Sequence, residues 1–538
     1  MPIRMEKDEP NEPRKPQNNQ DDQQNQQDKK NTQDPRNPQT NKDQQNQTGA
    51  NPLMKLIPFL ILFLFRNSKW FVPILFLVAA WYFFFGADAF VMTENENNPF
   101  SMGCSMEEEV FDKAEVFAPL AAGSFNTIPT SMSLLKYCPK RENQGRQGSC
   151  VGWSSAYAAR TILYSRATGK KPDEVKFSPS YLYNQIALPG CQGSYIQYAM
   201  EAMKKRGLVP LKDFGYDPTT CTVAPRAEHH QIAQNYRIKG FNRLTLDGNN
   251  YKVDMSAIKQ NLAQGAPVVI GMKVGQSFMQ GMRGREIWQP NRQDFTGAGM
   301  SGHAMCVIGY DDKKYGGAFQ LMNSWGKQWG RDGIGWVRYA DFDKFTLEAY
   351  GLYPEGLAEE KEVFSSTKLA VEFGLVDIES GEFIALREKG NRVFQSQRPI
   401  AVGDKFKIAV ANNIECNVYV FGQETDGSSY VLFPYTHKHS AYCGITGTRL
   451  FPNDYSMKAD EIGKKDYMAV VVSKDPIDYQ QVNARISQSR QSTYAAKLKD
   501  ALGPTQIKDV NFAADQTIGF ICETKGKNTV GVVIEIDK

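Results

Sequence analysis

The pattern of apolar and polar residues divides the chain into segments of different character. Residues 6–49 contain no Ala, Val, Ile, Leu, Met, Phe, Trp, Tyr or Cys, and Gln and Asn dominate them. Such a stretch has no side chains to bury against the entropy cost of ordering the backbone. We therefore predict a disordered Gln/Asn-rich tail over residues 1–52 that serves as a solvated tether.

Two apolar runs follow the tail. Residues 53–65 are apolar apart from Lys55, and residues 70–92 are apolar apart from Asp88. Only the second run is long enough to cross about 30 Å of hydrocarbon as a helix that rises about 1.5 Å per residue. The pattern predicts a membrane anchor over residues 53–92, with one transmembrane helix at about 70–90. The first run is predicted to be an interfacial helix, and a two-helix hairpin is the alternative.

The charges that flank the predicted span indicate its orientation. Lys55, Arg66 and Lys69 precede it, whereas residues 70–112 contain no Lys or Arg. Because positive side chains near a span tend to stay in the cytoplasm, this pattern predicts a single-pass protein of the cell membrane. Its tail is then cytoplasmic and the rest of the chain is periplasmic or extracellular. A cleaved signal peptide ending at Ala87-Asp88-Ala89 is the rival interpretation.

The last third of the chain has the pattern of β-strands. Phe406, Ile408 and Val410 alternate with polar neighbours, and further strand-like runs lie at 418–420, 467–472 and 530–536. The Asp426-Gly427 pair between two such runs predicts a hairpin. One helical insert is predicted near residues 477–502. We predict a linker over residues 93–127, a mixed domain over 128–358, and a mainly-β, sandwich-like domain over 359–538.

Composition excludes one broad class of function. The chain of 538 residues has 63 Lys and Arg against 59 Asp and Glu, a net charge of +4. This balance supplies no basic field to attract a polyanion, so we predict no nucleic-acid partner. Nine cysteines in this length are far fewer than in a small disulfide-stapled domain, so each has to be considered by its position.

One cysteine has the surroundings of a nucleophile. A glycine-rich loop at residues 143–149 leads into Cys150, and a stretch with helical spacing follows it and ends near Gly169. Cys150 is therefore predicted at or near a helix N-terminus. The unpaired N–H groups and the positive end of the helix dipole favour the thiolate there.

Two further motifs place polar side chains at the ends of predicted strands. His303 opens a short apolar run bounded by Gly302 and Gly309, which predicts a buried strand. Residues 319–322 form a second such run, and Asn323, Ser324, Trp325 and Gly326 follow it. Both positions suit groups that a rigid scaffold holds for catalysis.

Together these motifs resemble those of papain-family cysteine peptidases. The order of Gln144, Cys150, His303 and Asn323-Ser324-Trp325-Gly326 is the family order. The resemblance implies an α+β, papain-like two-lobed domain, with a helical lobe and a β-barrel-like lobe. The sequence departs from the family in two ways. Val151 and Gly152 separate Cys150 from Trp153, and His303 follows Cys150 by more than the usual distance. We infer an insertion, most simply at residues 275–300.

The resemblance also implies a role for each residue. Cys150 is the nucleophile, His303 its proton partner, and Asn323 holds the imidazole, with Trp325 covering that hydrogen bond. The Gln144 side-chain amide and the Cys150 N–H would stabilise the oxyanion. Residues 190–195 resemble a family segment that pairs with extended substrates, which makes Gly193 and Ser194 candidate substrate-binding residues. The site needs no cofactor.

The remaining cysteines allow several pairings. By resemblance, Cys191 and Cys221 lie near bridged positions of the family, and Gln147 stands where the partner of Cys191 is expected, so these two are predicted to pair with each other. Proximity in sequence makes Cys104 with Cys138 and Cys416 with Cys443 plausible, and Cys306 is predicted to be a buried thiol. His437, His439 and Cys443 could begin a zinc site, but the sequence offers no clear fourth ligand, and we predict no metal.

The resemblance raises the question of latency. Papain zymogens carry a long helical propeptide that blocks the cleft, and residues 93–127 are too few for one. Either the enzyme is made active, or a short element such as residues 116–120 occludes the site. The β-rich domain resembles an uncharacterised domain appended to bacterial peptidases and kinases, and its partner is unknown.

We therefore predict a bacterial, membrane-anchored cysteine peptidase that acts on peptide or protein substrates through a thioester on Cys150. One alternative is a catalytically silent papain-fold receptor for peptides or cell-wall material. Another is a cysteine transpeptidase or ligase, in which an amine replaces water at the thioester.

Overall fold

The computed structural model describes residues 3–7, 101–121, 125–245, 252–355, 367–453 and 455–538. The membrane span predicted at about 70–90, and nearly all of the predicted disordered tail, lie outside these residues. Within the described ranges, no helix combines the length and the apolar character needed to cross a bilayer.

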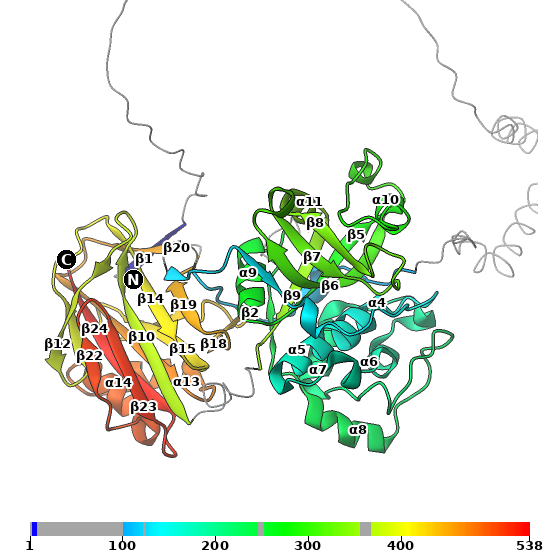
Figure 1. The fold of residues 1–538 in the computed structure, drawn as a ribbon. Coiled ribbons are helices and arrows are strands. Elements are labelled where there is room, and N and C mark those ends of the chain that lie inside the picture. The colour runs from blue at the N-terminus through cyan, green and yellow to red at the C-terminus, as the bar shows by residue number, and fades with distance from the viewer. Residues whose placement is uncertain (1–2, 8–100, 122–124, 246–251, 356–366, 454) are drawn as a thin grey trace, which may run out of the picture. The chain divides into compact units, whose positions relative to one another are not determined.

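The helical part of residues 101–355 is built around one helix that begins at Cys150 (Figure 1). Its consecutive parts are α4 (Cys150–Gly152), η4 (Trp153–Arg160), which has π-helical hydrogen bonding, and α5 (Thr161–Thr168). It ends where the sequence predicts, because Gly169 adopts a left-handed conformation with φ of +70°. The other helices of this part are α6 (Pro179–Ile186), α7 (Ile196–Lys205) and α8 (Ala227–Ala233).

The second part is a sheet of nine strands, to which residues 439–440 of the C-terminal region contribute one. Its path runs β17-β2-β4-β9-β5-β6-β7-β8, and β3 pairs with β6. The strands are β2 (Val116–Phe117), β3 (Ser131–Ser133), β4 (Phe241–Arg243), β5 (Val268–Val274), β6 (Ser301–Asp311), β7 (Ala318–Met322), β8 (Ile334–Arg338), β9 (Thr346–Leu352) and β17 (His439–Ser440). The β6 strand lies antiparallel between β5 and β7.

Shorter elements connect these parts. They are α3 (Glu108–Phe111), η3 (Leu135–Tyr137), η5 (Pro172–Glu174), η6 (Pro189–Cys191), η7 (Gln234–Tyr236), α9 (Met255–Ala263), α10 (Gln276–Met279), η8 (Asp294–Thr296), η9 (Lys314–Gly316) and α11 (Tyr339–Phe345). The segment that the sequence singles out as an insertion, residues 275–300, lies between β5 and β6 and holds α10 and η8.

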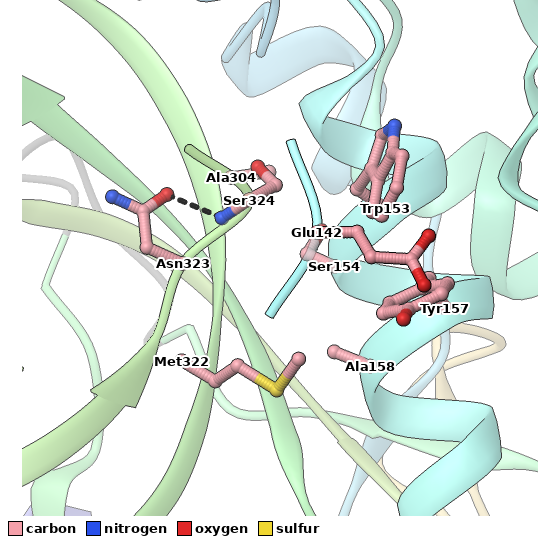
Figure 2. A pocket seen from close by; sticks show the side chains of 9 residues that line it. All are labelled: Glu142, Trp153, Ser154, Tyr157, Ala158, Ala304, Met322, Asn323 and Ser324. Atoms are coloured by element: carbon pink, nitrogen blue, oxygen red, sulfur yellow. Dashed lines mark hydrogen bonds between the residues drawn. The ribbon is translucent and has the colours of Figure 1, made fainter. Parts of the chain in front are cut away.

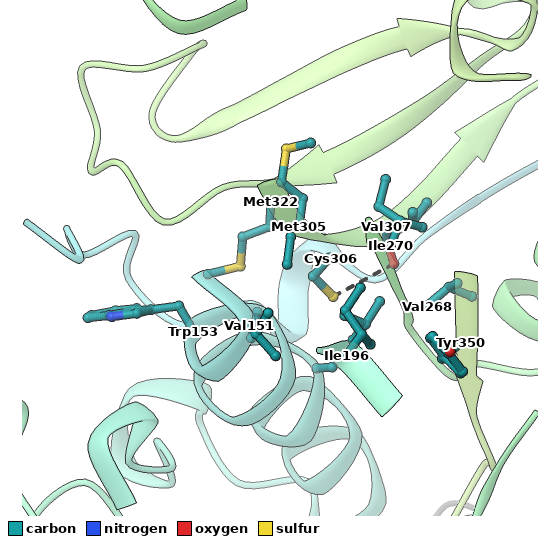
Figure 3. Packing of buried hydrophobic residues seen from close by; sticks show 14 of the residues in the cluster. Val151, Trp153, Ile196, Val268, Ile270, Met305, Cys306, Val307, Met322 and Tyr350 are labelled. Carbon is teal, nitrogen blue, oxygen red and sulfur yellow. Dashed lines mark hydrogen bonds between the residues drawn. The ribbon is translucent and has the colours of Figure 1, made fainter. Parts of the chain in front are cut away.

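The helix that begins at Cys150 packs against the sheet, and this contact positions the site. Figure 3 shows buried side chains from both parts in one cluster: Val151 and Trp153 from the helix, Ile196 from α7, Val268 and Ile270 from β5, Met305, Cys306 and Val307 from β6, Met322 from β7 and Tyr350 from β9. Burial of this apolar surface holds the start of the helix against the start of β6 and the end of β7.

The C-terminal region consists of two sheets around a shared core. One sheet follows the path β1-β20-β14-β10-β23-β22, joined by β11 and β19, and the other follows β12-β13-β24-β21-β15-β16, joined by β18. Their strands are β1 (Ile3–Lys7), β10 (Lys368–Asp377), β11 (Phe383–Ile384), β12 (Leu386–Gly390), β13 (Val393–Ser396), β14 (Lys405–Asn412), β15 (Cys416–Gln423), β16 (Ser429–Phe433), β18 (Tyr442–Cys443), β19 (Gly447–Phe451), β20 (Tyr455–Ala459), β21 (Lys465–Ser473), β22 (Phe512–Ala514), β23 (Ile518–Glu523) and β24 (Thr529–Asp537).

The predicted helical insert is two helices rather than one. They are α13 (Tyr479–Gln488) and α14 (Tyr494–Leu502), each begun by a capping side chain, Asp478 and Thr493, and η11 (Gly503–Thr505) follows. The helices cover the outer face of β15 and β21, where Tyr419, Phe421 and Val471 pack against them. This cover explains why β15 is buried on both faces, although the sequence pattern suggests alternation.

The start of the tail departs from the prediction. Residues 3–7, predicted to be disordered, form β1, which pairs antiparallel with β20. The Glu6 carboxylate lies 2.8 Å from the Nζ atoms of both Lys405 and Lys458. The backbone pairing with β20 and these two ion pairs hold the edge strand.

Candidate active site

The Cys150 thiol lies at the first residue of its helix and is fully buried. The Ala304 backbone N–H donates to Cys150 Sγ over 3.4 Å. Ala304 follows His303 on β6, so the sulfur and the imidazole-bearing strand are in direct contact. The structure places Cys150 at a helix N-terminus, as the sequence predicts.

His303 is held on two sides. Its Nε2 lies 2.8 Å from Asn323 Oδ1, and its ring stacks on Trp325 with centroids 4.1 Å apart and planes 19° apart. His303 and Asn323 are both buried. The other ring nitrogen, Nδ1, is buried without a hydrogen-bond partner among the described residues. The ring is therefore fixed in orientation, with one nitrogen left for a reacting group.

Asn323 and Gln144 are connected through Ser324. The Ser324 N–H donates to Asn323 Oδ1 over 2.7 Å, and Ser324 Oγ donates to Gln144 Oε1 over 2.5 Å. Figure 2 shows Asn323 and Ser324 across a small pocket from Trp153 and Tyr157. Both of these aromatic residues belong to the helix that begins at Cys150 and continues through η4 and α5, here called the central helix. The bond from Ser324 turns the Gln144 amide so that Nε2 is left to donate. In the sequence, Ser324 is only one member of the Asn323-Ser324-Trp325-Gly326 motif, and the pattern predicts no role for it.

A segment of the chain itself occupies this site. Residues 101–106, here called the strap, run between the helical part and the nine-stranded sheet. The Ser101 carbonyl accepts from Gln144 Nε2 over 3.1 Å and from Trp325 Nε1 over 2.9 Å. The Gly103 N–H donates to Cys150 Sγ. The candidate oxyanion donor and the candidate nucleophile are thus both engaged by the strap.

The strap also pairs with the candidate substrate-binding segment. The Ser194 N–H donates to the Gly103 carbonyl over 2.9 Å, and the Ser105 N–H donates to the Ser194 carbonyl over 3.0 Å, in a parallel bridge. On the other side, the Cys104 N–H donates to the Gly302 carbonyl over 3.1 Å. Gly193 adjoins this pairing, since a Cβ built on it would lie 2.4 Å from the Gly103 carbonyl oxygen. An extended peptide therefore fits between Ser194 and Gly302.

Small residues make room for the strap. A Cβ on Gly103 would lie 2.1 Å from the Gly148 carbonyl oxygen, so only glycine passes at this point. Gly271 and Gly302 leave space for the side chains of Cys104 and Met106. Beyond the strap, Phe111 is buried and lies under the Arg243 guanidinium at 4.8 Å. This contact anchors the chain where it leaves the site.

The strap is not the segment that the sequence suggests. Residues 116–120 were predicted as a possible occluding element, but Val116 and Phe117 form β2, and the Leu120 carbonyl accepts from Gln260 Nε2. The hypothesis names the wrong segment, because the pairing of residues 103–105 with Ser194 and Gly302 joins positions about 90 to 200 apart in the chain. The one local signal in the strap is Gly103, whose small size is needed for a contact that no sequence pattern reveals.

Burial changes both ionisable groups of the site. It raises the pKa of the Cys150 thiol to about 12, although backbone N–H groups of Ala304 and Gly103 oppose the shift. Burial also lowers the pKa of His303 to about 4, against the raising effect of the hydrogen bond to Asn323. With the strap in place, burial therefore favours the neutral thiol and the neutral imidazole. Nucleophilic attack needs the thiolate and imidazolium instead.

The predicted cysteine pairings are met in part. Cys191 and Cys221 form a disulfide, as predicted. Cys104 and Cys138 do not pair, because Cys104 lies in the strap while the Cys138 thiol donates to the Leu134 carbonyl. Cys416 and Cys443 are free thiols directly opposite each other on β15 and β18. Cys306 is a buried free thiol, as predicted.

Comparison with known proteins agrees with this geometry. Residues 131–354 match the papain family cysteine protease model, and residues 400–476 match a domain of unknown function, DUF4384. The chain thus carries a papain-family cysteine peptidase domain. A DUF4384 domain follows it.

Several curated proteins are similar to the peptidase region. It is 27% identical over 226 residues to an uncharacterized peptidase C1-like protein of Acanthamoeba polyphaga mimivirus, a match that covers 38% of this chain and 64% of that protein. It is 25% identical over 213 residues to cathepsin K of Mus musculus, covering 38% of this chain and 58% of the cathepsin. The chain thus spans less than two thirds of these relatives. Among solved structures, xylellain, a cysteine protease from Xylella fastidiosa, is 22% identical, covers 47% of this chain and 96% of its own, and has a TM-score of 0.39.

Proposed function

We propose that this protein is a cysteine peptidase that hydrolyses peptide bonds through a thioester on Cys150. The observation that carries the proposal is convergence: Gln144, Cys150, His303 and Asn323 come from distant parts of the sequence and meet in one buried site. A structural core has no need for a buried imidazole nitrogen that has no partner among the described residues, on a strand that contacts a thiol at a helix N-terminus.

The chemistry follows from the contacts. In the open site the Cys150 thiolate attacks the substrate carbonyl carbon, and a C–S bond forms. The Gln144 Nε2–H and the Cys150 N–H stabilise the oxyanion. His303 donates its proton to the leaving amine as the C–N bond breaks. The same imidazole then removes a proton from water, which attacks the thioester, releases the carboxylic acid and restores Cys150. Asn323 and Trp325 keep the ring in its orientation throughout.

We also propose that the strap keeps the peptidase inactive. The strap presents the Gly103 N–H to the Cys150 sulfur. The strap carbonyl of Ser101 occupies Gln144 Nε2, the donor needed for the oxyanion. The peptidase therefore becomes active only when residues 101–106 leave the site, by displacement or by a cut in the chain.

A labelling experiment tests both parts of the proposal. The purified full chain is treated with an epoxysuccinyl peptide, and adducts are measured by intact mass. The key variant is Gly103→Val, whose side chain cannot fit against Gly148. Overpacking of this kind costs about 1–3 kcal/mol, so labelling should be roughly tenfold faster or more than in the wild type. The matched control is Gly519→Ala, where a Cβ meets open space.

The outcomes separate the two parts. We expect one adduct in Gly103→Val and no adduct when Cys150→Ala is added. Gly103→Val should hydrolyse a denatured protein substrate before labelling and should not do so after it. Equal labelling of wild type and Gly103→Val would contradict inhibition by the strap, whereas the proposal of an activated Cys150 thiol would still stand. A folded Gly103→Val chain with no adduct would contradict the peptidase and favour a binding protein. An adduct without hydrolysis, but with peptide joined to an added amine, would favour a transpeptidase or ligase.

We also propose that the peptidase is anchored in a bacterial cell membrane by a single span at about 70–90, with its tail in the cytoplasm and residues 93–538 outside. The support is the apolar run at residues 70–92 and the placement of Lys55, Arg66 and Lys69 on one side of it. The Cys191–Cys221 disulfide is consistent with an oxidising compartment. The substrates would then be peptides or proteins outside the cytoplasm.

A further inference from the structure

Tyr216, which lies outside every motif of the sequence analysis, contacts both ends of the loop that precedes Cys150. Its hydroxyl donates to the Gln144 carbonyl over 2.6 Å and lies 2.7 Å from Ser149 Oγ. The Gln144 side chain carries one candidate oxyanion donor. Ser149 precedes Cys150, whose N–H is the other. A single hydroxyl therefore connects the residues on which both donors depend.

We propose that Tyr216 is a positioning residue for the oxyanion hole, which holds the loop of residues 144–149 so that its two donors point at one place. The inference rests on the proposed peptidase function. Tyr216 acts through Gln144 and Ser149 and does not itself contact the substrate.

The loop has need of such support. Gly145 adopts φ of +68°, and a side chain on Gly148 would be close to three backbone atoms, so these two positions contribute no side chains that could hold the loop. Gln147 supplies a second tie, because its Nε2 donates to the Thr220 carbonyl over 2.9 Å. Gln147 stands where the family resemblance leads one to expect a cysteine bridged to Cys191. Hydrogen bonds here replace a covalent link.

The segment that carries Tyr216 is itself anchored. Cys221, next to Thr220, forms the disulfide with Cys191, and the Asp217 N–H donates to Ser180 Oγ over 3.2 Å. The Tyr216 ring also packs edge-on against Trp153 of the central helix, with centroids 4.8 Å apart. Burial raises the pKa of Tyr216, so its hydroxyl keeps the proton that it donates to Gln144. The hydroxyl is thus a fixed donor on a fixed ring.

The geometry predicts which step of the reaction Tyr216 affects. Oxyanion donors work because they are preorganised, and loss of one whole donor lowers kcat by about 100- to 1,000-fold. Tyr216→Phe keeps the ring and removes only the hydroxyl, which loosens the donors without deleting them. We expect kcat to fall roughly tenfold, with KM changed by less than about twofold, because the change acts in the transition state.

The test compares reactions that do and do not form an oxyanion. In the Gly103→Val chain, Tyr216→Phe should lower kcat and weaken binding of a peptide aldehyde, whose adduct with Cys150 is tetrahedral. The rate of Cys150 alkylation by iodoacetamide should not change, because that displacement forms no oxyanion. The matched control is Tyr181→Phe, which also loses one tyrosine hydroxyl bond, to His230 Nδ1 at 3.1 Å, away from the loop.

A second measurement needs no turnover. Amide hydrogen exchange of residues 143–149 in the full chain should be faster in Tyr216→Phe than in Tyr181→Phe. An unchanged kcat, a rise in KM alone, an equal fall in alkylation and kcat, or unchanged exchange would each overturn the inference. If Gly103→Val shows no hydrolysis while exchange still rises, the proposed function fails and the role of Tyr216 in holding the loop stands.

Discussion

The imidazole of His303 is buried where only its neutral form is stable. The ring is fully buried and stacks on Trp325, and burial lowers its pKa from 6.5 to about 4. The hydrogen bond from His303 Nε2 to Asn323 Oδ1 opposes this shift and does not cancel it. The free energy of unfolding therefore depends on pH through this residue.

The sign follows from proton binding. Between pH 6.5 and pH 4, the unfolded chain binds a proton at His303 that the folded chain does not. The contribution is full above pH 6.5 and is lost as the pH falls through 4, a change of about 3 kcal/mol for a shift of this size. Denaturant unfolding at pH 7 and pH 4.5 should show a larger loss of stability in the wild type than in His303→Gln, whose side chain does not titrate. Equal losses in the two proteins would contradict the assignment.

Ser324 has a role of its own at this scale. Its hydroxyl donates to Gln144 Oε1, so that Gln144 Nε2 faces the Ser101 carbonyl to which it donates, and the Ser324 N–H donates to Asn323 Oδ1. We expect Ser324→Ala to lower kcat in the Gly103→Val chain by roughly tenfold, because a buried amide that loses its partner can turn. Ser154→Ala, which removes a hydroxyl bonded within the central helix, is a suitable control. A change confined to KM would show that Ser324 does not orient the amide.

Two paired strands of the C-terminal region bring Cys416 and Cys443 face to face. They are directly opposed in the antiparallel register of β15 and β18, and both are buried. The contact between the two thiols raises the pKa of Cys416 and lowers the pKa of Cys443. One member of the pair is thus the better nucleophile toward a disulfide reagent.

This arrangement predicts that β15 and β18 can be cross-linked by oxidation. With oxidised glutathione, the two thiols should form a disulfide by losing two protons and two electrons, which the glutathione disulfide takes up as two thiols. Closing the intervening loop should stabilise the region by about 3–4 kcal/mol. Peptide mass mapping would identify the 416–443 link, and Cys443→Ser should abolish it. If both thiols remain free after treatment with oxidised glutathione, the prediction is wrong and the strands do not open enough to react.

At the scale of the whole molecule, the proposed anchor decides where the peptidase acts. A span at about 70–90 with basic residues before it should keep the full chain in the membrane fraction after carbonate washing. A variant without residues 53–92 should be released into the soluble fraction. In intact cells whose outer barrier has been opened, external protease should reach residues 101–538 and spare a tag on the tail. Protection of the peptidase region together with the tag would contradict the proposed orientation.

The amino-acid sequence alone determined much of the candidate site and of the C-terminal strands. Cys150 at a helix start, His303 in a buried strand and Asn323 at a strand end follow from local periodicity, glycine placement and motif order, which depend on neighbouring residues. The strands at 405–412, 416–423, 465–473 and 529–537 follow from the same local signals.

The tertiary structure alone decided what covers the site. The strap pairs with Ser194 and Gly302, Tyr216 ties Gln144 to Ser149, and α13 and α14 cover β15. Each of these contacts joins residues far apart in the chain. The strap depends on close approach of backbones, Tyr216 on its hydroxyl group, and the cover of β15 on packing of apolar side chains. Periodicity cannot reveal such contacts, because it reports which face of an element is apolar and not which distant segment will pack against it.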